Sequence, residues 1–216
     1  MLATAAAHTA THPQVAFETT PQPQLRPVRA ADLPAMRQFV LGLSSDSRGL
    51  RFHGGVNPSS ERLLTHLTQA DGRRHIALVA VLPCDDGDVV VGEARCVRGA
   101  DGEAAEFAIS VADAWQGRGL ARQLLAALLA AAAQAGMDTV VGDVLTRNSR
   151  MGRFMQNAGF EATAGDEAGV QRWVCQLLSS QPEQPASQAL ESTAPAGWMA
   201  WVVRQLAWTR PAARAV

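Results

Sequence analysis

The 216-residue sequence contains no lysine and no tyrosine, and all 19 of its basic residues are arginines. A Walker phosphate-binding loop and a Schiff-base enzyme both need a lysine, so the sequence excludes both, along with acetylation of the chain on its own side chains. Cysteine is also scarce. Cys84, Cys96 and Cys175 have the spacing of neither a disulfide framework nor a zinc site, which favours a reducing compartment such as the cytoplasm.

The sequence also lacks an excess of positive charge and long apolar runs. The formal net charge is −1, so the chain has no overall positive field for binding nucleic acid. No stretch reaches about 18 uninterrupted apolar residues, the length that a membrane span needs. The first residues also lack the basic start and apolar run of a secretory signal. We therefore expect a cytoplasmic protein with no membrane span, no nucleic-acid partner and no metal.

Composition divides the chain into four parts. Residues 1–24 have few apolar side chains and predict a disordered tail. Residues 25–178 carry the apolar pattern of one domain, and residues 179–197, rich in Ser, Gln and Pro, are typical of a linker. Residues 198–216 hold three of the five tryptophans and predict a short helix, folded back on its own domain or on the second subunit of a homodimer. An interfacial membrane helix or a partner-binding motif is the alternative.

Apolar periodicity within the domain predicts an α/β fold, with a mixed β-sheet flanked by helices. The residues from 43 to 60, rich in Ser, Gly and Arg, are expected to form an irregular loop, and Cys84–Asp88 a hairpin turn. The expected strands are residues 25–29, 75–82, 89–97, 103–111, 138–145 and 170–177, and the expected helices 33–43, 61–70, 119–135 and 148–158.

The segment between the third long strand and its following helix has the features of an anion-binding turn. Gly117 and Gly119 let the backbone approach a diphosphate closely, and the N–H groups that open the helix point at it. Ala121 keeps the next turn small, and Arg118 and Arg122 add charge at the rim. A plain glycine-containing turn is the alternative. The dinucleotide-binding fingerprint fails, because Arg122 stands where its third small residue is needed.

These residues resemble a known family. Gln116-Gly117-Arg118-Gly119-Leu120-Ala121 matches the acetyl-CoA signature Q/R-x-x-G-x-G/A of the GCN5-related N-acetyltransferases, the GNAT superfamily. A second signature of that family is matched by Asn148, Met151, Phe154, Gly159 and Phe160. Residues 43–52 and 105–108 look like the bacterial protein lysine acetyltransferases that inactivate acetyl-CoA synthetase. The resemblance covers about residues 25–177.

The resemblance implies the GNAT fold, with acetyl-CoA as co-substrate. It also implies that the acceptor amine attacks the thioester directly within a ternary complex. The backbone N–H of Val111 is then expected to stabilise the thioester oxygen, and Asn148 either contacts the cofactor arm or only caps its helix. The implied cofactor-binding residues are Ile109, Val111, Gln116, Gly117, Arg118, Gly119, Leu120, Ala121 and Asn148.

An amine acceptor must lose a proton before it attacks, because a lysine amine has an ordinary pKa of about 10.4. Glu106 is the candidate general base, since on a strand it shares a face with Ala108 and Ser110, whose small side chains leave room for a substrate. The alternative for Glu106 is a structural ion pair with Arg95 or another arginine. Glu103 and His53 are the less favoured bases.

The general acid, the acceptor and the class of function each have more than one candidate. The tyrosine that commonly protonates the leaving thiolate in the family would occupy position 155, where this sequence has Met155, so the general acid is unassigned. A protein lysine is the favoured acceptor, with the segment from Arg48 to Phe52 contacting it. A small-molecule amine or an N-terminal amine is the alternative within the same chemistry. A non-catalytic acyl-CoA sensor is the alternative of a different class.

Overall fold

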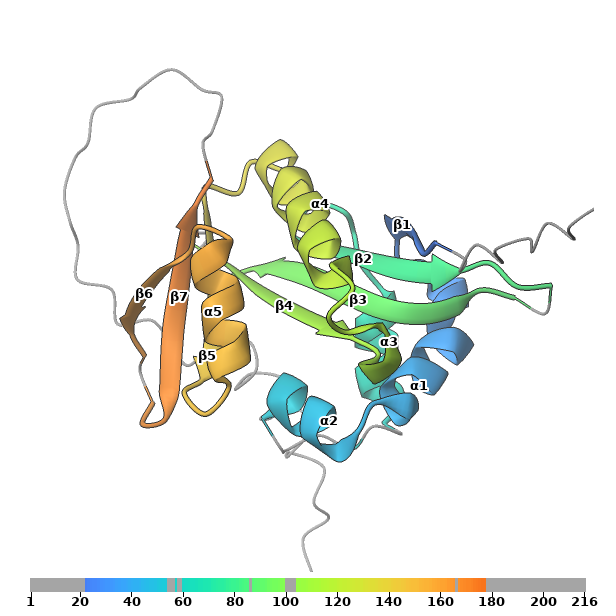
Figure 1. Cartoon of the computed structure of the whole chain (residues 1–216). Helices are drawn as coiled ribbons and strands as arrows, with labels where there is room; N and C mark the ends of the chain where they lie inside the picture. Colours follow the sequence, from blue (N-terminus) through green and yellow to red (C-terminus); the bar gives the residue numbers. More distant parts are fainter. Residues whose placement is uncertain are drawn as a thin grey trace, which may run out of the picture.

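A computed structural model describes residues 22–53, 57, 60–85, 87–99, 104–165 and 167–177. These residues form a seven-stranded mixed sheet in the order β1-β2-β3-β4-β5-β7-β6 (Figure 1). The predicted fold class is confirmed. The expected linker and tryptophan-rich segment lie outside the described residues, as does nearly all of the expected N-terminal tail. The strands are β1 Gln24–Pro27, β2 His75–Leu82, β3 Val89–Arg98, β4 Ala105–Val111, β5 Thr139–Leu145, β6 Glu161–Ala164 and β7 Val170–Gln176.

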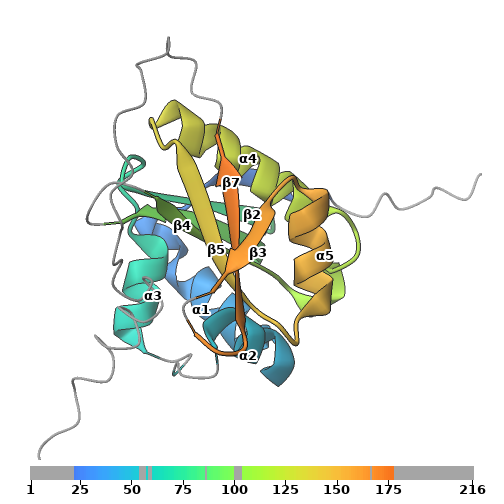
Figure 2. The same cartoon turned by 90° about the vertical axis from the view of Figure 1, so that its left-hand side faces the viewer.

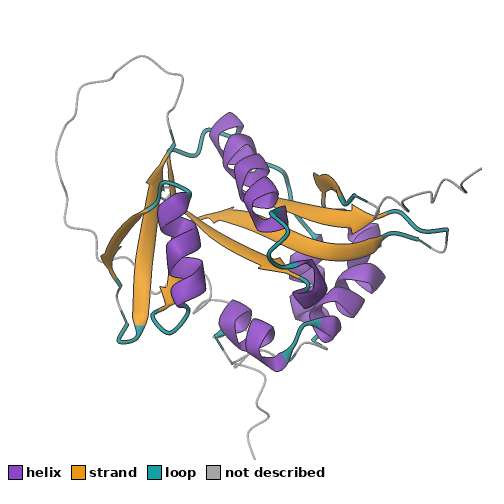
Figure 3. Cartoon of the chain, viewed as in Figure 1, coloured by secondary structure: helices purple, strands orange, loops and turns teal. Residues whose placement is uncertain are grey.

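Helices cover both faces of the sheet. In Figures 1 and 3, α4 and α5 lie in front of the strands, α1 and α3 lie behind them, and α2 lies below the sheet. None of the helices in the described ranges is both long and apolar enough to cross a membrane. The helical elements are η1 Ala30–Asp32, α1 Leu33–Gly42, α2 Ser45–Phe52, α3 Glu61–Thr68, η2 Asp113–Trp115, α4 Leu120–Gln134 and α5 Ser149–Asn157.

The sheet separates two apolar cores. Leu124 and Leu128 of α4 and Met155 of α5 pack with Phe107 and Val140 on one face. Met36 and Val40 of α1 and the leucines of α3 pack with Val79 and Val81 on the other. Burial alternates along β4, as the period of two predicts, so that Phe107, Ile109 and Val111 enter the first core. Glu106, Ala108 and Ser110 therefore face the side of α1 and α3.

Strands β4 and β5 are parallel and pair only at their beginnings. Two residue pairs join them, Ala105 with Val140 and Glu106 with Val141, whereas β4 pairs with β3 over its full length. Beyond Glu106 the two strands part and leave an opening between them. Figure 1 shows β4 running away from β5, and Figure 2 shows the two strands crossing at an angle. Within the described part of the chain, the edge of β4 from Phe107 to Val111 has no strand partner on the β5 side.

Two elements differ from the expectation. The expected irregular loop is wrong from Ser45 to Phe52, where α2 forms with Ser44 as its N-cap, accepting a hydrogen bond from the Ser47 N–H at 3.2 Å. This helix lacks an apolar stripe, because one of its two buried side chains is Arg51. Strand β6 was not predicted, because it is only four residues long, all four are exposed at the sheet edge, and its only apolar side chains are those of two alanines.

Candidate active site

The unpaired edge of β4 presents backbone hydrogen-bonding groups to the opening. The N–H of Ala112 donates to the Val91 carbonyl on β3 at 2.9 Å. Because alternate residues of an antiparallel strand direct their backbone groups to opposite sides, those of Ile109 and Val111 point toward β5. Gln116 Nε2 donates to the Val111 carbonyl from that side, at 3.1 Å. An extended chain of amides could bind along this edge as an additional strand does.

The turn that follows β4 depends on its glycines. Gly117 and Gly119 have φ angles of 77° and 83°, a left-handed conformation that strains residues with a Cβ. Gly119 is the N-cap of the 15-residue helix α4. The N–H groups of the first turn of a helix have no intrahelical partners and lie at the positive end of the helix dipole. The turn thus has the features that hold an anionic group.

A cavity of about 360 Å³ lies between this turn, α2 and α5. Seven of the nine expected cofactor-binding residues line it: Ile109, Val111, Gln116, Gly117, Gly119, Ala121 and Asn148. The other two do not. Leu120 is 4% exposed and packs in the core, and the guanidinium of Arg118 lies 5.0 Å from the centre of the Trp115 ring. Lining residues that were not among the expected nine include Ser47, Leu50, Arg51, Trp115 and Arg150.

A smaller cavity of about 70 Å³ adjoins the first. Glu106, half-buried on β4, lines it together with His53 and Asp143. Leu50, Arg51, Ile109, Asn148 and Met151 line both cavities. The carboxylate-bearing cavity and the cavity above the glycine turn therefore meet at residues of α2, β4 and α5.

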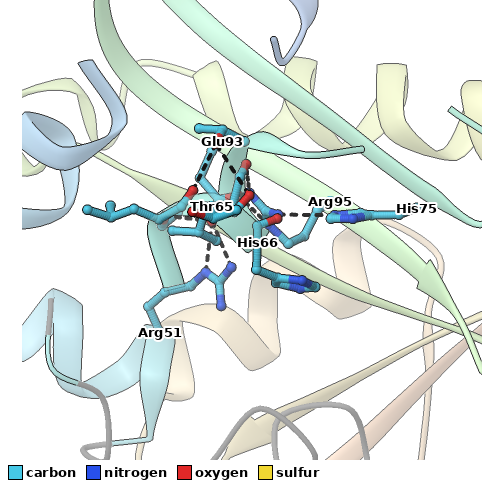
Figure 4. Close-up of polar contacts among 10 residues, drawn as sticks. Arg51, Thr65, His66, His75, Glu93 and Arg95 are labelled. Atoms are coloured by element: carbon cyan, nitrogen blue, oxygen red, sulfur yellow. Dashed lines mark hydrogen bonds and ion pairs between the residues drawn. The ribbon is translucent and has the colours of Figure 1, made fainter. Parts of the chain in front are cut away.

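Glu93 of β3 is a second carboxylate close to this region, and sequence reasoning did not identify it. It is 1% exposed and lies between Arg51 and Arg95, which approach its two oxygens at 2.8 Å (Figure 4). Burial would raise the pKa of Glu93, but the two guanidinium charges outweigh burial and lower it to about 2. Glu93 therefore stays ionised and cannot accept a proton near neutral pH. Arg95, one partner named in the alternative structural role of Glu106, is paired with Glu93.

Contact of the segment from Arg48 to Phe52 with the acceptor stays a prediction, but Arg51 lies on helix α2 and not in the expected loop. Its side chain is 3% exposed and reaches inward to Glu93, instead of standing out on a loop. Arg51 nevertheless lines both cavities, so its guanidinium belongs to their shared wall.

A polar network joins α2 to the glycine turn. Both oxygens of Asp113 accept hydrogen bonds, from the Ser44 N–H at 3.0 Å, the Ser44 hydroxyl at 2.8 Å and the Ser47 hydroxyl at 2.7 Å. The Ser44 N–H, followed by the hydroxyls, lowers the pKa of Asp113. Gln116 continues the network, donating to the Ser47 hydroxyl at 3.3 Å and accepting from Arg150 at 2.8 Å.

Three further expected positions have defined surroundings. His53 ends α2 in a left-handed conformation, with φ of 49°, and burial lowers its pKa. Asn148 is the N-cap of α5, accepting from the Met151 N–H at 3.1 Å, and it also lines both cavities. Met155 is fully buried in the core, so the side chain at this position does not face either cavity. Among the residues described, no three His, Cys, Asp or Glu side chains gather as a metal site.

The sequence and the fold match known proteins. The family model described as an acetyltransferase (GNAT) domain matches residues 24–161. Acetyltransferase PA5475 of Pseudomonas aeruginosa is 34% identical over 113 residues, which cover 52% of this chain and 60% of that protein. Acetyltransferase Pat of Mycolicibacterium smegmatis is 32% identical over 138 residues, which cover 62% of this chain and 40% of that protein. The matches thus span less than two thirds of the length of both curated relatives.

Solved structures share the fold. The GNAT domain of S. lividans PAT superposes with a TM-score of 0.66 and 29% identity, over 72% of this chain and 90% of that one. The structure of yncA from Salmonella typhimurium with its cofactor acetyl-CoA gives a TM-score of 0.57 at 24% identity, over 78% of this chain and 99% of that one.

Proposed function

Because this chain belongs to the GNAT acetyltransferase family, we propose that it transfers the acetyl group of acetyl-CoA to a lysine side chain of another protein, with Glu106 as general base. The observation that carries the proposal is the meeting of two cavities, one above the glycine turn and one beside Glu106. In a ternary complex the two substrates would occupy these cavities and react where they meet. A small-molecule amine remains the alternative acceptor.

The residues of the larger cavity fit acetyl-CoA. The backbone N–H groups around Gly117 and Gly119 suit its diphosphate, and the unpaired edge at Ile109 and Val111 suits the amides of its pantetheine arm. Asn148 lies in the wall of both cavities, where its side chain could contact that arm. When bound, acetyl-CoA supplies the activated thioester. The relative from Salmonella typhimurium, whose structure contains acetyl-CoA, supports this assignment.

Glu106 is the carboxylate best suited to deprotonate the acceptor. A lysine amine arrives mostly as an ammonium ion, and Glu106 takes its proton directly or through water. Glu93 is unsuited to this role because Arg51 and Arg95 keep it ionised. The N–H of Val111 is directed to the opening, where it can donate to the thioester oxygen as charge develops there. His53, which lines the same cavity, is the second candidate base.

The general acid does not come from position 155. A thiol with an ordinary pKa of about 8.5 leaves without a dedicated acid, so water or the proton of the acceptor can serve. The same position supports the second candidate function, a non-catalytic acyl-CoA sensor, because Met155 is buried where a tyrosine is frequent in the family.

The remaining assignments belong to the same proposal. Residues 25–178 form the catalytic domain, with the tail at residues 1–24 and the linker at residues 179–197 outside it. Residues 198–216 mediate self-packing or a homodimer. Cys84, Cys96 and Cys175 are free thiols, which supports a cytoplasmic location. Truncation after Leu178, followed by sizing chromatography and vesicle flotation, separates dimerisation from membrane binding.

Labelled acetyl-CoA tests the transfer, with cell extract and lysine peptides as acceptors. We expect Glu106→Gln to reduce kcat by at least about 100-fold, the scale of general base catalysis, with little change in acetyl-CoA affinity by calorimetry. Glu161→Gln, at an exposed position of β6, is the matched control and should transfer normally. His53→Gln, measured in the same assay, tests the second candidate base.

If the purified protein bound acetyl-CoA but acetylated no lysate protein, peptide or small amine, the sensor hypothesis would replace the enzyme hypothesis. If only small amines were labelled, a small-molecule amine would replace a protein lysine as the proposed acceptor.

A further inference from the structure

The smaller cavity has a second carboxylate that the proposed reaction leaves without a role. Asp143 of β5 lines it together with Glu106 of β4. Glu106 pairs directly with Val141, so these two side chains lie on the same face of the sheet. Asp143 is two residues further along β5 and shares that face. Two carboxylates therefore flank one cavity at the place where β4 and β5 part.

Arg172 of β7 fixes the direction of the Asp143 carboxylate. Its Nε donates to Oδ1 at 2.9 Å and its Nη2 to Oδ2 at 3.0 Å, from the residue directly opposite Asp143 in the sheet. The Asp143 side chain is still 30% exposed. A carboxylate offers about four lone-pair sites, and this fork uses two of them. The carboxylate is thus held in place and retains acceptor capacity.

The other described residues around the cavity do not provide a second negative charge beside Glu106, as Asp143 does. Arg51 is engaged with the buried Glu93, and burial lowers the pKa of His53 against the opposing effect of the Asp143 charge. Opposite Asp143, past the last residue pair between the strands, β4 presents the small side chain of Ala108 to the cavity. About 70 Å³ accommodates the end of an aminoalkyl chain rather than a large headgroup.

We propose that Asp143 binds the ammonium form of the acceptor, so that the enzyme selects cationic primary amines over uncharged amines of the same shape. This inference rests on the proposed function. An ammonium has three N–H donors, and one hydrogen bond to Asp143 leaves another to face Glu106. Glu106 then removes a proton, and the neutral amine attacks. Asp143 would thus recognise the charge of the ammonium group, and Glu106 would remove that charge by taking a proton.

Two peptides that differ in one group test this proposal with the full chain and acetyl-CoA. One peptide carries lysine, and the other carries its aminooxy analogue, which has the same length but is uncharged near neutral pH. For Asp143→Asn we expect kcat/KM to fall about tenfold with the lysine peptide, mainly through KM, and less than about threefold with the aminooxy peptide, the difference expected for one charged hydrogen bond.

Arg172→Gln is the matched variant, because it breaks the same ion pair but retains the Asp143 charge. Because Arg172 also orients the carboxylate, kcat/KM for the lysine peptide should fall in this variant, but less than in Asp143→Asn, and the preference for lysine over the aminooxy analogue should remain. If both variants lost activity alike, or if Asp143→Asn affected both peptides equally, the role of Asp143 would be structural and the proposal overturned.

Calorimetry separates this inference from the proposed function. The affinity of the lysine peptide for the complex of the protein with CoA should fall about tenfold in Asp143→Asn. If neither peptide were acetylated but binding still depended on Asp143, the transferase function would fail and the cation site would stand. Peptide binding that does not depend on Asp143 would overturn the inference, whatever the transfer assay shows.

Discussion

Arg51 of α2 donates two hydrogen bonds, at 2.9 and 2.8 Å, to one oxygen of Glu93 on β3. Of the eight residues of α2, only Arg51 and Phe52 are buried, so apolar packing contributes little to holding this helix. The position of α2 therefore depends on polar contacts at both ends, with Asp113 at the first turn and Glu93 at the last. Because α2 lines both cavities, these contacts connect the stability of the fold to the shape of the active site.

We expect Arg51→Ala to destabilise the fold and the site together. Removing the guanidinium leaves the buried Glu93 with Arg95 as its remaining charge partner, and breaking a buried pair costs about 3 kcal/mol or more. Acetyl-CoA affinity and acetyl transfer should both fall, because Arg51 lines both cavities. Urea unfolding and calorimetry measure the two effects.

Arg73→Ala, at an exposed position before β2, is the matched control for that substitution. We expect its free energy of unfolding to change by no more than about 0.5 kcal/mol, the usual range for surface positions. An Arg51→Ala protein as stable as the unaltered chain would contradict the structural role of the buried pair.

Stability should fall in two stages as pH decreases. His66 and His75 stack with ring centroids 5.0 Å apart, and burial, aided by the charge of Arg95, lowers the pKa of each from 6.5 to about 4. The unfolded chain therefore binds protons between pH 6.5 and 4 that the folded chain does not, so the free energy of unfolding falls through this window. Glu93, with its pKa lowered to about 2, adds a loss as pH falls below its ordinary value of 4.5.

Urea unfolding from about pH 8 down to about pH 3 measures the whole first stage and the upper part of the second, which continues toward the lowered pKa of Glu93 at about 2. His75→Gln assigns the first stage. A glutamine oxygen can accept from Arg95 in place of His75 Nε2, which lies 3.1 Å from Nη1, but glutamine does not titrate. The slope between pH 6.5 and 4 should decrease in this variant and the loss below 4.5 should remain. A stability that stays level from pH 6.5 to 4.5 would contradict the assignment to the histidines.

Asp113→Asn should impair acceptor binding more than folding. The substitution replaces one acceptor oxygen with a donor nitrogen, which cannot accept from Ser44 or Ser47, and so loosens the first turn of α2. We expect the acceptor KM to rise about threefold to tenfold, the effect of losing one or two hydrogen bonds. Asp46→Asn is the matched control, because it removes the same charge from the exposed first turn of α2. Equal effects of the two would indicate helix electrostatics instead of the bonds to Asp113.

The sequence predicted the part of the site that local rules determine. Gly117 and Gly119 show where the chain adopts positive φ, and the alternation along β4 correctly separated Glu106 from Phe107 and Ile109. Both patterns depend on neighbours within a few residues. The signature turn and the strand before it were therefore predictable without knowledge of the tertiary contacts.

The buried charges were not predictable from such rules. Arg51 and Glu93 are 42 residues apart in the chain, and a charged residue that alternates with apolar ones is normally assigned to a solvated face. Here α1 and α3 cover that face, and Arg51 reaches it from α2. The one available signal was Glu93 with Arg95, two opposite charges two residues apart in a strand that is otherwise largely apolar. The partner of Asp143 was likewise hidden, because Arg172 reaches it only through the pairing of β5 with β7.

Alanine substitutions at two glycines, one at each end of α4, can distinguish an effect on cofactor binding from an effect of backbone strain. Gly119 before the helix and Gly136 after it have φ of 83° and 71°, and a Cβ at either would meet no atom within 4 Å. Alanine should therefore cost a similar free energy at both, about 1 to 2 kcal/mol for a left-handed residue. Only Gly119 lines the larger cavity, where a Cβ would occupy the space that a diphosphate needs.

We accordingly expect Gly119→Ala to weaken acetyl-CoA binding at least about tenfold, which corresponds to about 1.4 kcal/mol. Gly136→Ala should lose a similar amount of stability and keep its affinity. Calorimetric titration with acetyl-CoA, alongside urea unfolding of both variants, makes the comparison. If the two variants lost affinity equally, the effect would come from strain in α4, and the diphosphate would have to bind away from the glycine turn.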